Sequence, residues 1–505
     1  MSKEELLEEN KELKTENFLL KEENAQLKKM MFAAKRERFE GSMDAAQLNI
    51  FGNTSGEQTS EEPAEEKQST KKKKKAAKPK KRNSFPASLK RQTTILLPEQ
   101  IEQADEMTQI GQDVTELLAY HPASLYVKEI IRPRGIVKAD PQSGIVQAAI
   151  PPRLIPKGMV DESLVAELVN EKVQFHTPIH RFSKKLKQAG VDFISENNLY
   201  NWFHTAAETL SAIYDLLIQD ILAQNYIQGD ETRMPVLSKN KKGAAHRGQM
   251  WAFMAPTIRA VAFNYEPTRS TQSAKMVLED YEGILQVDGY SAYEKLAKNR
   301  PIQLIYCMAH ARRKFFEAKD NHPELANYFL GQLQKLYQIE KDCRDQKRTV
   351  EQREAIRKQE AVPILQELEK WLSLQSADPK LLPKSLIKKA ITYTYSRWQG
   401  LSAYAQNGEL EIDNNLVENT IRPIALGRKN YMFAGSDVGA QNLAILYSII
   451  GTCLQHQLNA QNYLHWLLKK VTAHKITPQA INWLPHRIDP QILEKFRLEQ
   501  MEGMG

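Results

Sequence analysis

The order of apolar segments between Tyr226 and Cys307 constrains the fold of this chain more than any other feature of its sequence. Three short apolar segments follow one another, the first opening at Tyr226 and the others covering residues 250–255 and 258–265. Each is bounded by turn-forming residues, which is typical of consecutive strands in an antiparallel meander. The sequence therefore predicts three neighbouring strands that begin near Tyr226.

A helix and two further strands are predicted after this meander. Apolar residues at helical spacing begin near Ser273 and stop at Gly283. The continuous apolar run of residues 284–287 then predicts a strand buried on both faces, and this strand ends at Asp288. After a short helix, residues 303–307 predict another strand, which leads to His310 near the start of a helix. This is the ribonuclease-H-like order, in which acids on the first and fourth strands lie side by side.

Asp230 and Asp288 occupy those two places. Two adjacent carboxylates can bind Mg²⁺, and a pair of such ions can assist the cleavage of a phosphodiester bond. The alternative is that Asp230 caps a loop and that Asp288 forms a turn before Gly289. The strand order favours the metal-binding interpretation.

Glu418 is the candidate for a third carboxylate. Asn414 or Asn415 can cap a helix whose next turn carries Glu418, with Arg422 four residues further along the same face. A Glu and an Arg at this spacing commonly form only a surface ion pair. The basic and small residues of segments 427–430 and 433–436 favour a phosphate-contacting edge instead.

Length and cysteine content limit the class of protein. The chain has 505 residues, enough for about three domains. Its three cysteines include no C-x-x-C pair, which excludes a disulfide framework and a cysteine-built zinc site and fits a reducing cytosol. A charged N-terminus and the lack of a long apolar run predict neither a signal peptide nor a membrane span. We therefore expect a cytoplasmic protein, and the family resemblance described below implies association with the bacterial nucleoid.

The positive charge of the chain is concentrated in one segment. The formal net charge is +8, and residues 71–82 contain nine basic residues and no acid. This run includes Lys71, Lys72, Lys73, Lys74 and Lys75. It could neutralise DNA phosphates without sequence preference, or it could be a solvated linker, and charge alone does not decide between them.

The first thirty residues carry leucines at seven-residue spacing: Leu6, Leu13, Leu20 and Leu27. Asparagines at positions 10, 17 and 24 lie on the same seam, which favours a weak, parallel two-stranded coiled coil. The alternative is one helix that packs its leucines on its own core. We prefer self-association into a homodimer or a higher oligomer.

A helix-turn-helix pattern precedes the strands. Residues 181–188 and a second helix capped by Ser195 flank a turn at Gly190, and the second helix carries Asn198 and Asn201, which could reach base edges. Two helices around a glycine also occur in many proteins that do not bind DNA.

Five strings in the sequence are specific: GDET, VDGYSAY, CMAHARRKFFEA, IDNNLVENTIRPIALGRKNYMFAGSDVGA and LAILYSIIGTC. They closely resemble DDE transposases of the bacterial insertion-sequence-sixty-six type, and the resemblance covers nearly the whole chain. It implies that Asp230, Asp288 and Glu418 bind two Mg²⁺ or Mn²⁺ ions and form the catalytic triad. It also implies a DNA transposase that binds the ends of an insertion sequence, cleaves them and joins them to target DNA.

Further predictions accompany this resemblance. Besides the lysine run, the residues expected to contact double-stranded DNA are Arg312, Arg313, Lys314, Arg422, Arg428, Lys429, Asn198 and Asn201. The zinc-binding region of the family has cysteine pairs, whereas residues 97–151 here contain none and offer only His121, so we predict no zinc. His310 could assist near the metals or simply begin a helix.

The predicted fold class is a ribonuclease-H-like α/β catalytic domain with an all-α insertion. Helical spacing in residues 324–343, 350–374 and 385–404 supports the insertion, with a break or kink expected at Pro363. The competing function is a catalytically silent DNA-binding dimer on the same fold, against which the intact triad argues.

The predicted regions are a leucine zipper (1–40), a disordered basic linker (41–90), a β-rich module (91–155), a helix-turn-helix region (156–222), the catalytic domain (223–320 and 405–455), the helical insertion (321–404) and a C-terminal segment (456–505).

Overall fold

The computed structural model describes residues 152–502, except 157, 159, 238–243, 269–277, 279 and 299, together with Leu125 and two short strands. These strands are β1 (Arg134–Ile136) and β2 (Ile145–Gln147), and they pair antiparallel. The chain divides into two compact units, Met1–Val127 and Lys128–Gly505, and the central sheet with its helices belongs to the second unit. The predicted zipper, linker and lysine run, and most of the predicted β-rich module, lie outside the described residues.

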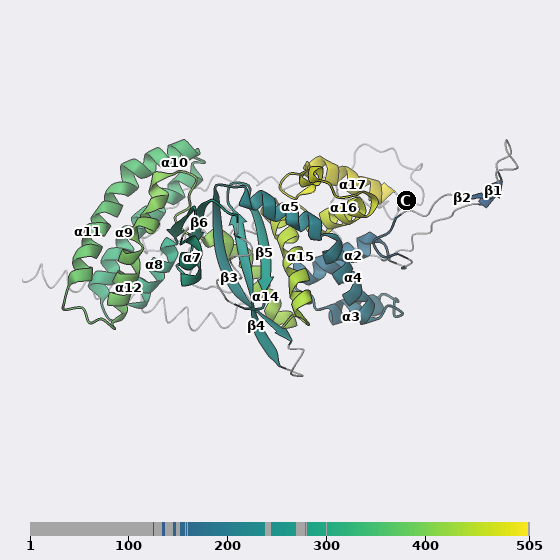
Figure 1. Cartoon of the computed structure of the whole chain (residues 1–505), viewed down its shortest axis with the longest axis horizontal. Coiled ribbons are helices and arrows are strands. Elements are labelled where there is room, and N and C mark those ends of the chain that lie inside the picture. The colour runs from purple at the N-terminus through teal and green to yellow at the C-terminus, as the bar shows by residue number, and fades with distance from the viewer. Residues whose placement is uncertain are drawn as a thin grey trace, which may run out of the picture. The chain divides into compact units, whose positions relative to one another are not determined.

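A five-stranded mixed sheet forms the centre of the second unit (Figure 1), with the strand order β5-β4-β3-β6-β7. β3 (Tyr226–Leu237), β4 (Ala245–Ala255) and β5 (Ala260–Glu266) are antiparallel neighbours. β6 (Gly283–Val287) runs parallel to β3, and β7 (Ile302–Tyr306) runs parallel to β6. The predicted meander and the two later strands are therefore present as a mixed α/β arrangement.

Two details of this stretch differ from the predictions or are not described. β5 begins at Ala260, two residues later than predicted, because residues 256–259 form a turn in which Arg259 has φ 47°. Most of the helix predicted from Ser273 lies outside the described residues, and Leu278, Asp280 and Tyr281 at its end are not helical. Short helices α7 (Ser291–Ala297) and α8 (Met308–Glu317) connect and follow β6 and β7 as expected.

Helix α15 (Asp437–Gln455) covers the outer edge of β5. The Thr452 hydroxyl accepts a hydrogen bond from Val261 N at 3.1 Å, and the Ser448 hydroxyl accepts one from Phe263 N at 2.7 Å. Such side-chain contacts satisfy backbone groups that an edge strand would otherwise expose. This edge of the sheet is thus closed to further strands.

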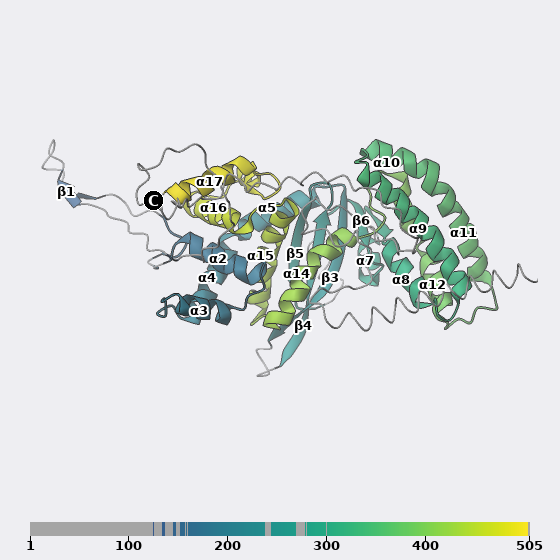
Figure 2. The ribbon, with the colours of Figure 1, turned by 180° about the vertical axis from the view of Figure 1, so that it is seen from behind.

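Helix α14 (Asn415–Tyr431) crosses the sheet over β3 and β4 (Figure 2). It ends at Tyr431 with Met432 as its C-cap, beyond which Ala434 N donates to Pro235 O at 2.9 Å and Leu237 N donates to Ala434 O at 3.0 Å. These bonds join the end of α14 to the far end of β3.

In the described part of the chain, four helices precede the sheet: α2 (Glu162–Val173), α3 (Ile179–Gln188), α4 (Glu196–Thr209) and α5 (Ser211–Leu222). Gly190, in the turn between α3 and α4, has φ 84°, a conformation that favours glycine. Ser195 caps α4 by accepting a hydrogen bond from Asn198 N at 3.2 Å. The two helices and the tight turn of the predicted helix-turn-helix pattern are present.

The segment between β7 and α14 is helical and has its own core, built with β7 and α8. It contains α9 (Pro323–Asp345), α10 (Val350–Ile356), α11 (Val362–Ala377), α12 (Leu386–Ser396), α13 (Trp398–Ser402) and a 3₁₀ turn (Ala403–Gln406). A π-helical stretch, Arg357–Ala361, lies directly before Pro363. The irregularity predicted at Pro363 is therefore a π-bulge in the preceding turn, because proline has no N–H for the regular bond.

The C-terminal part adds α16 (Ala460–Ala473), a 3₁₀ helix (Pro478–Trp483) and α17 (Pro490–Glu502). One hydrophobic core joins the sheet to α2, α4, α5, α15 and α16. Asp220 on α5 accepts hydrogen bonds from His486 and Arg487, each at 2.6 Å, and so holds the C-terminal segment against the core. Among the described residues, no helix combines the length and the apolar character needed to cross a membrane.

Candidate active site

The register of two parallel strands places Asp230 and Asp288 at corresponding positions. Gln228 of β3 pairs with Gln286 of β6, and each aspartate follows its glutamine by two residues. Side chains two residues apart on a strand share a face, and neighbouring strands are about 4.8 Å apart. Asp230 lies in β3 and Asp288 directly follows β6, so the register places the two acids at corresponding positions of neighbouring strands.

Each aspartate accepts one backbone hydrogen bond from its own strand or turn. Asp230 Oδ1 accepts from Glu231 N, and Asp288 Oδ1 accepts from Tyr290 N, both at 2.8 Å. Asp288 thus forms the turn that the alternative interpretation predicted, whereas Asp230 lies inside β3 and does not cap a loop. A carboxylate has about four lone-pair sites, so one backbone bond is compatible with cation binding.

A buried amide links both strands to the start of α14. Gln228 Nε2 donates to Gln286 Oε1 at 2.8 Å and to Asp413 O at 3.0 Å, and Gln228 Oε1 accepts from Val417 N at 3.1 Å. Gln228 is fully buried, so each of these bonds fixes geometry in the interior. The residue that follows Val417 is Glu418, and this network therefore holds it where its charge acts on Asp230.

The start of α14 differs from the sequence prediction. Asn414 is the N-cap, but its side chain makes no capping hydrogen bond, and both its amide atoms are buried without a partner. The carboxylate of Asp413 instead accepts from Asn415 N at 3.1 Å, and Asn415 lies inside the helix. Asn414 is thus the N-cap residue as predicted, but the hydrogen bond to the first turn comes from the carboxylate of the preceding Asp413 and not from its side chain.

The three acids influence one another electrostatically. Burial raises the pKa of Asp230 well above its usual value, and the nearby charges of Glu418, Glu231 and Asp288 raise it further. Burial also raises the pKa of Glu418, to which Asp413 and Asp288 add, while Arg313 and Arg422 oppose the shift. The site is therefore an anionic cluster in which negative charges repel one another.

His310 and Cys307 lie beside Glu418. His310 Nδ1 is 3.8 Å from Glu418 Oε1, and burial lowers the pKa of this imidazole although the charge of Asp288 raises it. One potential ligand atom from each of Cys307, His310 and Glu418 falls within 4.8 Å of the others. Cys307 Sγ also accepts a hydrogen bond from Asn414 N at 3.4 Å, which ties α8 to the start of α14. The structure thus places His310 at the carboxylates as well as near the start of a helix.

Comparison with known proteins decides the family. A model described as "Transposase IS66 family" matches residues 157–442, a range that contains Asp230, Asp288 and Glu418. The chain belongs to the IS66 transposase family. A second model, described as "Transposase C of IS166 homeodomain", matches residues 19–94.

Curated relatives of this IS66-family chain come from Sinorhizobium fredii. The uncharacterized protein y4jD is 33% identical over 411 residues, covering 78% of this chain and 79% of its own. The uncharacterized protein y4qI is 30% identical over 414 residues, which cover 78% of this chain and 74% of y4qI. The similarity thus extends over most of both chains.

The predicted DNA-contacting residues of this IS66-family member fall into several places. The positive charges of Arg313 and Arg422 lower the pKa of Glu418, and both residues are exposed. Arg312 is exposed on α8, whereas the Lys314 ammonium lies 4.6 Å from the centre of the Tyr393 ring. Lys429 is exposed on the last turn of α14. The charges of Arg313 and Arg422 thus act on Glu418, and that of Lys314 acts on His310 beside it.

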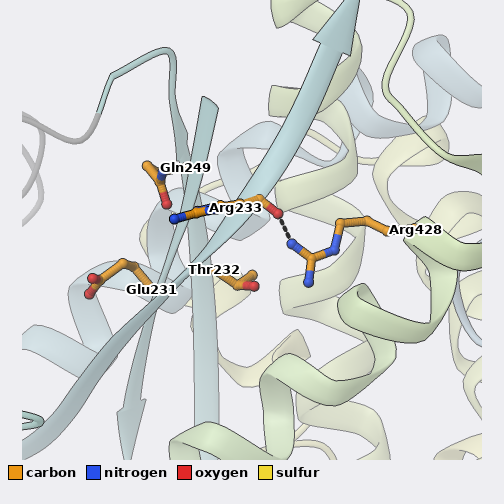
Figure 3. A pocket seen from close by; sticks show the side chains of 5 residues that line it. All are labelled: Glu231, Thr232, Arg233, Gln249 and Arg428. Carbon is orange, nitrogen blue, oxygen red and sulfur yellow. Dashed lines mark hydrogen bonds between the residues drawn. The ribbon is translucent and has the colours of Figure 1, made fainter. Parts of the chain in front are cut away.

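Arg428 lines a cavity of about 310 Å³ together with Glu231, Thr232, Arg233 and Gln249 (Figure 3). Its guanidinium reaches from α14 to β3 and donates to Arg233 O. Burial lowers the pKa of Arg428, although it remains a cation under all ordinary conditions. This cavity lies on β3, directly after Asp230.

Asn198 and Asn201 are exposed on α4, as a base-contacting helix requires. α4 also contacts the start of α15, where Asn442 Nδ2 lies 2.8 Å from His204 Nδ1. Lys71, Lys72, Lys73, Lys74 and Lys75 lie outside the described residues.

Sequence reasoning missed the residues that hold the acids in place. Gln228 and Gln286 are the clearest examples, and Tyr226 joins them because its hydroxyl accepts from Gln228 Nε2 at 3.0 Å. A signal was present: each aspartate is preceded two residues earlier by a glutamine, and each glutamine directly follows apolar residues of its strand. A polar residue in a strand buried on both faces needs partners, which predicts such a network.

Proposed function

We propose that this chain is an active DNA transposase with a ribonuclease-H-like catalytic domain, which binds the ends of its insertion sequence, cleaves them and transfers the strands to target DNA. The observation that carries the proposal is the matched placement of Asp230 and Asp288 on adjacent parallel strands, with Glu418 held over them by α14. The strand order β5-β4-β3-β6-β7 and membership of the IS66 family support it.

The residues present fit divalent cations. Carboxylate oxygens are the ligands that Mg²⁺ and Mn²⁺ prefer, and the mutual repulsion of these buried acids would be relieved by positive charge. Asp230, Asp288 and Glu418 would hold two such ions. When bound there, the ions supply activation of the attacking oxygen and stabilisation of the leaving oxygen.

Neighbouring residues then have defined tasks. Arg313 and Arg422 flank Glu418 and can neutralise the phosphates on either side of the scissile bond. His310, 3.8 Å from Glu418 Oε1, can orient that carboxylate. The exposed face of α4, with Asn198 and Asn201, is placed to read base edges in the major groove.

The same proposal implies two binding partners, which are DNA and a second copy of the chain. Double-stranded DNA is the substrate, and the leucine repeat would pair two chains so that two element ends are held together. Residues 71–75 would add phosphate contacts without sequence preference. Sedimentation of the full chain and of a deletion of residues 1–31, each with end DNA, tests the pairing role.

The catalytic proposal is tested by cleavage of a duplex that carries the element's own end, with Mg²⁺ present. Asp230→Asn, Asp288→Asn and Glu418→Gln each remove a negative charge at nearly constant volume, so cleavage should fall by two or more orders of magnitude while duplex binding persists. The matched controls are Asp345→Asn and Glu369→Gln, whose side chains are exposed on the insertion. Near-wild-type cleavage by any of the three variants would remove that residue from the triad, and a wild-type chain that binds ends without cutting would favour the silent dimer.

A further inference from the structure

The turn that ends α14 has a strained backbone. Met432 has φ 62° and ψ −45°, and Phe433 N donates to Tyr431 O at 2.7 Å. A hydrogen bond across three residues with a positive φ at the centre is a γ-turn of the rare, strained kind. Non-glycine residues in such a conformation cluster at functional sites, where the surrounding structure holds them in place.

Contacts on both sides hold this turn. Met432 N donates to Arg428 O at 2.9 Å, and Ala434 pairs with the end of β3 through its N–H and its carbonyl. The Tyr431 hydroxyl lies 2.9 Å from that of Tyr447, and the Lys172 ammonium of α2 lies 4.1 Å from the centre of the Tyr431 ring. The strained geometry is therefore fixed by α14, β3, α15 and α2 together.

The strained turn exposes two large apolar side chains to solvent. Met432 is 64% exposed and Phe433 is 38% exposed. The last turn of α14 beside them carries Arg428 and Lys429. A partner that offers both apolar surface and negative charge matches this combination, and DNA offers it as base faces between phosphates.

The position of the turn relative to the acids can be estimated along two routes. Val236, which bridges to Ala434, lies six residues beyond Asp230 on β3, about 20 Å at the rise of a strand. Met432 lies fourteen residues beyond Glu418 along α14, about 21 Å at the rise of a helix. At about 3.4 Å per base pair, both routes give about six base pairs.

We propose that Met432 and Phe433 insert against unstacked bases of the element end, about six base pairs from the phosphate that is cut, on the side bound by α4. The inference rests on the proposed function, since it needs DNA to lie across the acidic cluster. It assigns the turn a role in distorting the duplex, which apolar side chains perform in other DNA-binding proteins by separating neighbouring bases.

The test uses end duplexes that each carry one 2-aminopurine, a base whose fluorescence rises when it is unstacked. The full chain with Glu418→Gln binds without cutting and is the reference. When this chain binds, the fluorescence of 2-aminopurine should rise most in the duplex that carries it about six base pairs from the cleavage position. Phe433→Ala should abolish that rise and weaken end binding by about tenfold, in line with the loss of one stacked base.

Two further variants separate this role from a structural one. Met432→Gly accepts a positive φ without strain, so its thermal midpoint should equal or exceed that of the reference chain while the fluorescence rise is lost. Leu374→Ala is the matched control, because Leu374 is 70% exposed on the helical insertion, and it should leave the rise unchanged.

The outcomes distinguish failure of this inference from failure of the proposed function. If the wild-type chain cleaves ends but no rise appears near six base pairs, or if Phe433→Ala leaves the rise intact, the inference is overturned and the proposed function stands. If the wild-type chain does not bind or cut ends, both are overturned. If Phe433→Ala changes the sedimentation mass of the free chain but not the fluorescence, the turn contacts another protein chain, and the inference is also overturned.

Discussion

Asp413 shows how the start of α14 depends on one buried acid. Its carboxylate accepts hydrogen bonds from Asn415 N at 3.1 Å and from the Tyr337 hydroxyl of α9 at 2.9 Å. Burial raises the pKa of Asp413 to about 6, although these two bonds lower it. The helical insertion therefore contacts, through Tyr337, the residue that precedes the helix of Glu418.

This shift predicts a pH dependence of stability. The folded pKa lies above the value of about 3.9 in an unfolded chain, so the folded state binds the proton more tightly. The contribution of Asp413 to stability is complete below about pH 4 and is lost as the pH rises through about 6. A shift of two units corresponds to roughly 3 kcal/mol.

Asp413→Asn removes this titration because an amide does not ionise. The free energy of unfolding of the variant minus that of the wild type should therefore increase by roughly 3 kcal/mol between pH 4 and pH 7. Urea unfolding at several pH values measures this difference, in which groups that titrate alike in both proteins cancel. A difference that does not change with pH would contradict the prediction.

Residue chemistry explains which parts of the site were predictable. Asp230 and Asp288 were predicted as site residues because the strand order defines their places, and Glu418 because it lies in the first turn of a predicted helix and within a string that resembles the family. Gln228 was not identified, because its role depends on bonds to Asp413 and Val417, which follow it by more than 180 residues. Such pairings arise from tertiary structure, so the sequence can show that a buried glutamine needs partners but not which residues they are.

At the scale of elements, the π-helical stretch Arg357–Ala361 connects the long helix α9 of the insertion with residues 404–407, which lie shortly before α14. Arg357 is fully buried, and its guanidinium donates to Glu340 through Nε at 2.8 Å and through Nη2 at 2.7 Å. It also donates to Tyr404 O at 3.0 Å and to Asn407 O at 2.7 Å. One side chain thus joins α9, the π-helix and the 3₁₀ turn.

Arg357→Met should strongly destabilise the protein, because it removes both short hydrogen bonds to the buried carboxylate of Glu340 and leaves it only the longer contact with Arg353, at 3.5 Å. We expect a loss of about 3–5 kcal/mol in the free energy of unfolding. The double variant Glu340→Met with Arg357→Met should recover much of this loss, since no buried charge remains. Lys358→Met, at the exposed neighbouring position, is the control and should change little. Urea titration of the four proteins checks this, and equal stability of the two Arg357 variants would contradict it.

Element boundaries were predictable where local chemistry sets them. Ser195 caps α4 as expected, and residues 303–307 were placed within one residue of β7. The π-bulge was expected only as a break at Pro363, because the sequence shows the missing N–H of proline but not how the preceding turn accommodates it. The side-chain covering of β5 by Ser448 and Thr452 was not predicted, since it joins residues about 190 positions apart.

At the scale of the second unit, distant segments converge on one face of the sheet. β3 and β6 bring the aspartates, α14 brings Glu418, and α8 brings His310. The insertion supports this face from two directions, since Tyr393 donates to Asp288 O at 2.6 Å and Tyr337 donates to Asp413. A helical insertion that contacts both acid-bearing turns is therefore expected to influence cation binding, although it supplies none of the three acids.

The proposed function requires that Asp230, Asp288 and Glu418 together bind divalent cations. Anomalous X-ray scattering from crystals of the full chain soaked in Mn²⁺ tests it most directly, because the signal locates the metal independently of activity. We predict anomalous peaks in contact with all three carboxylates, and their loss in Glu418→Gln crystals. The absence of a peak at the three acids, or a peak held only by Cys307 and His310, would contradict the account.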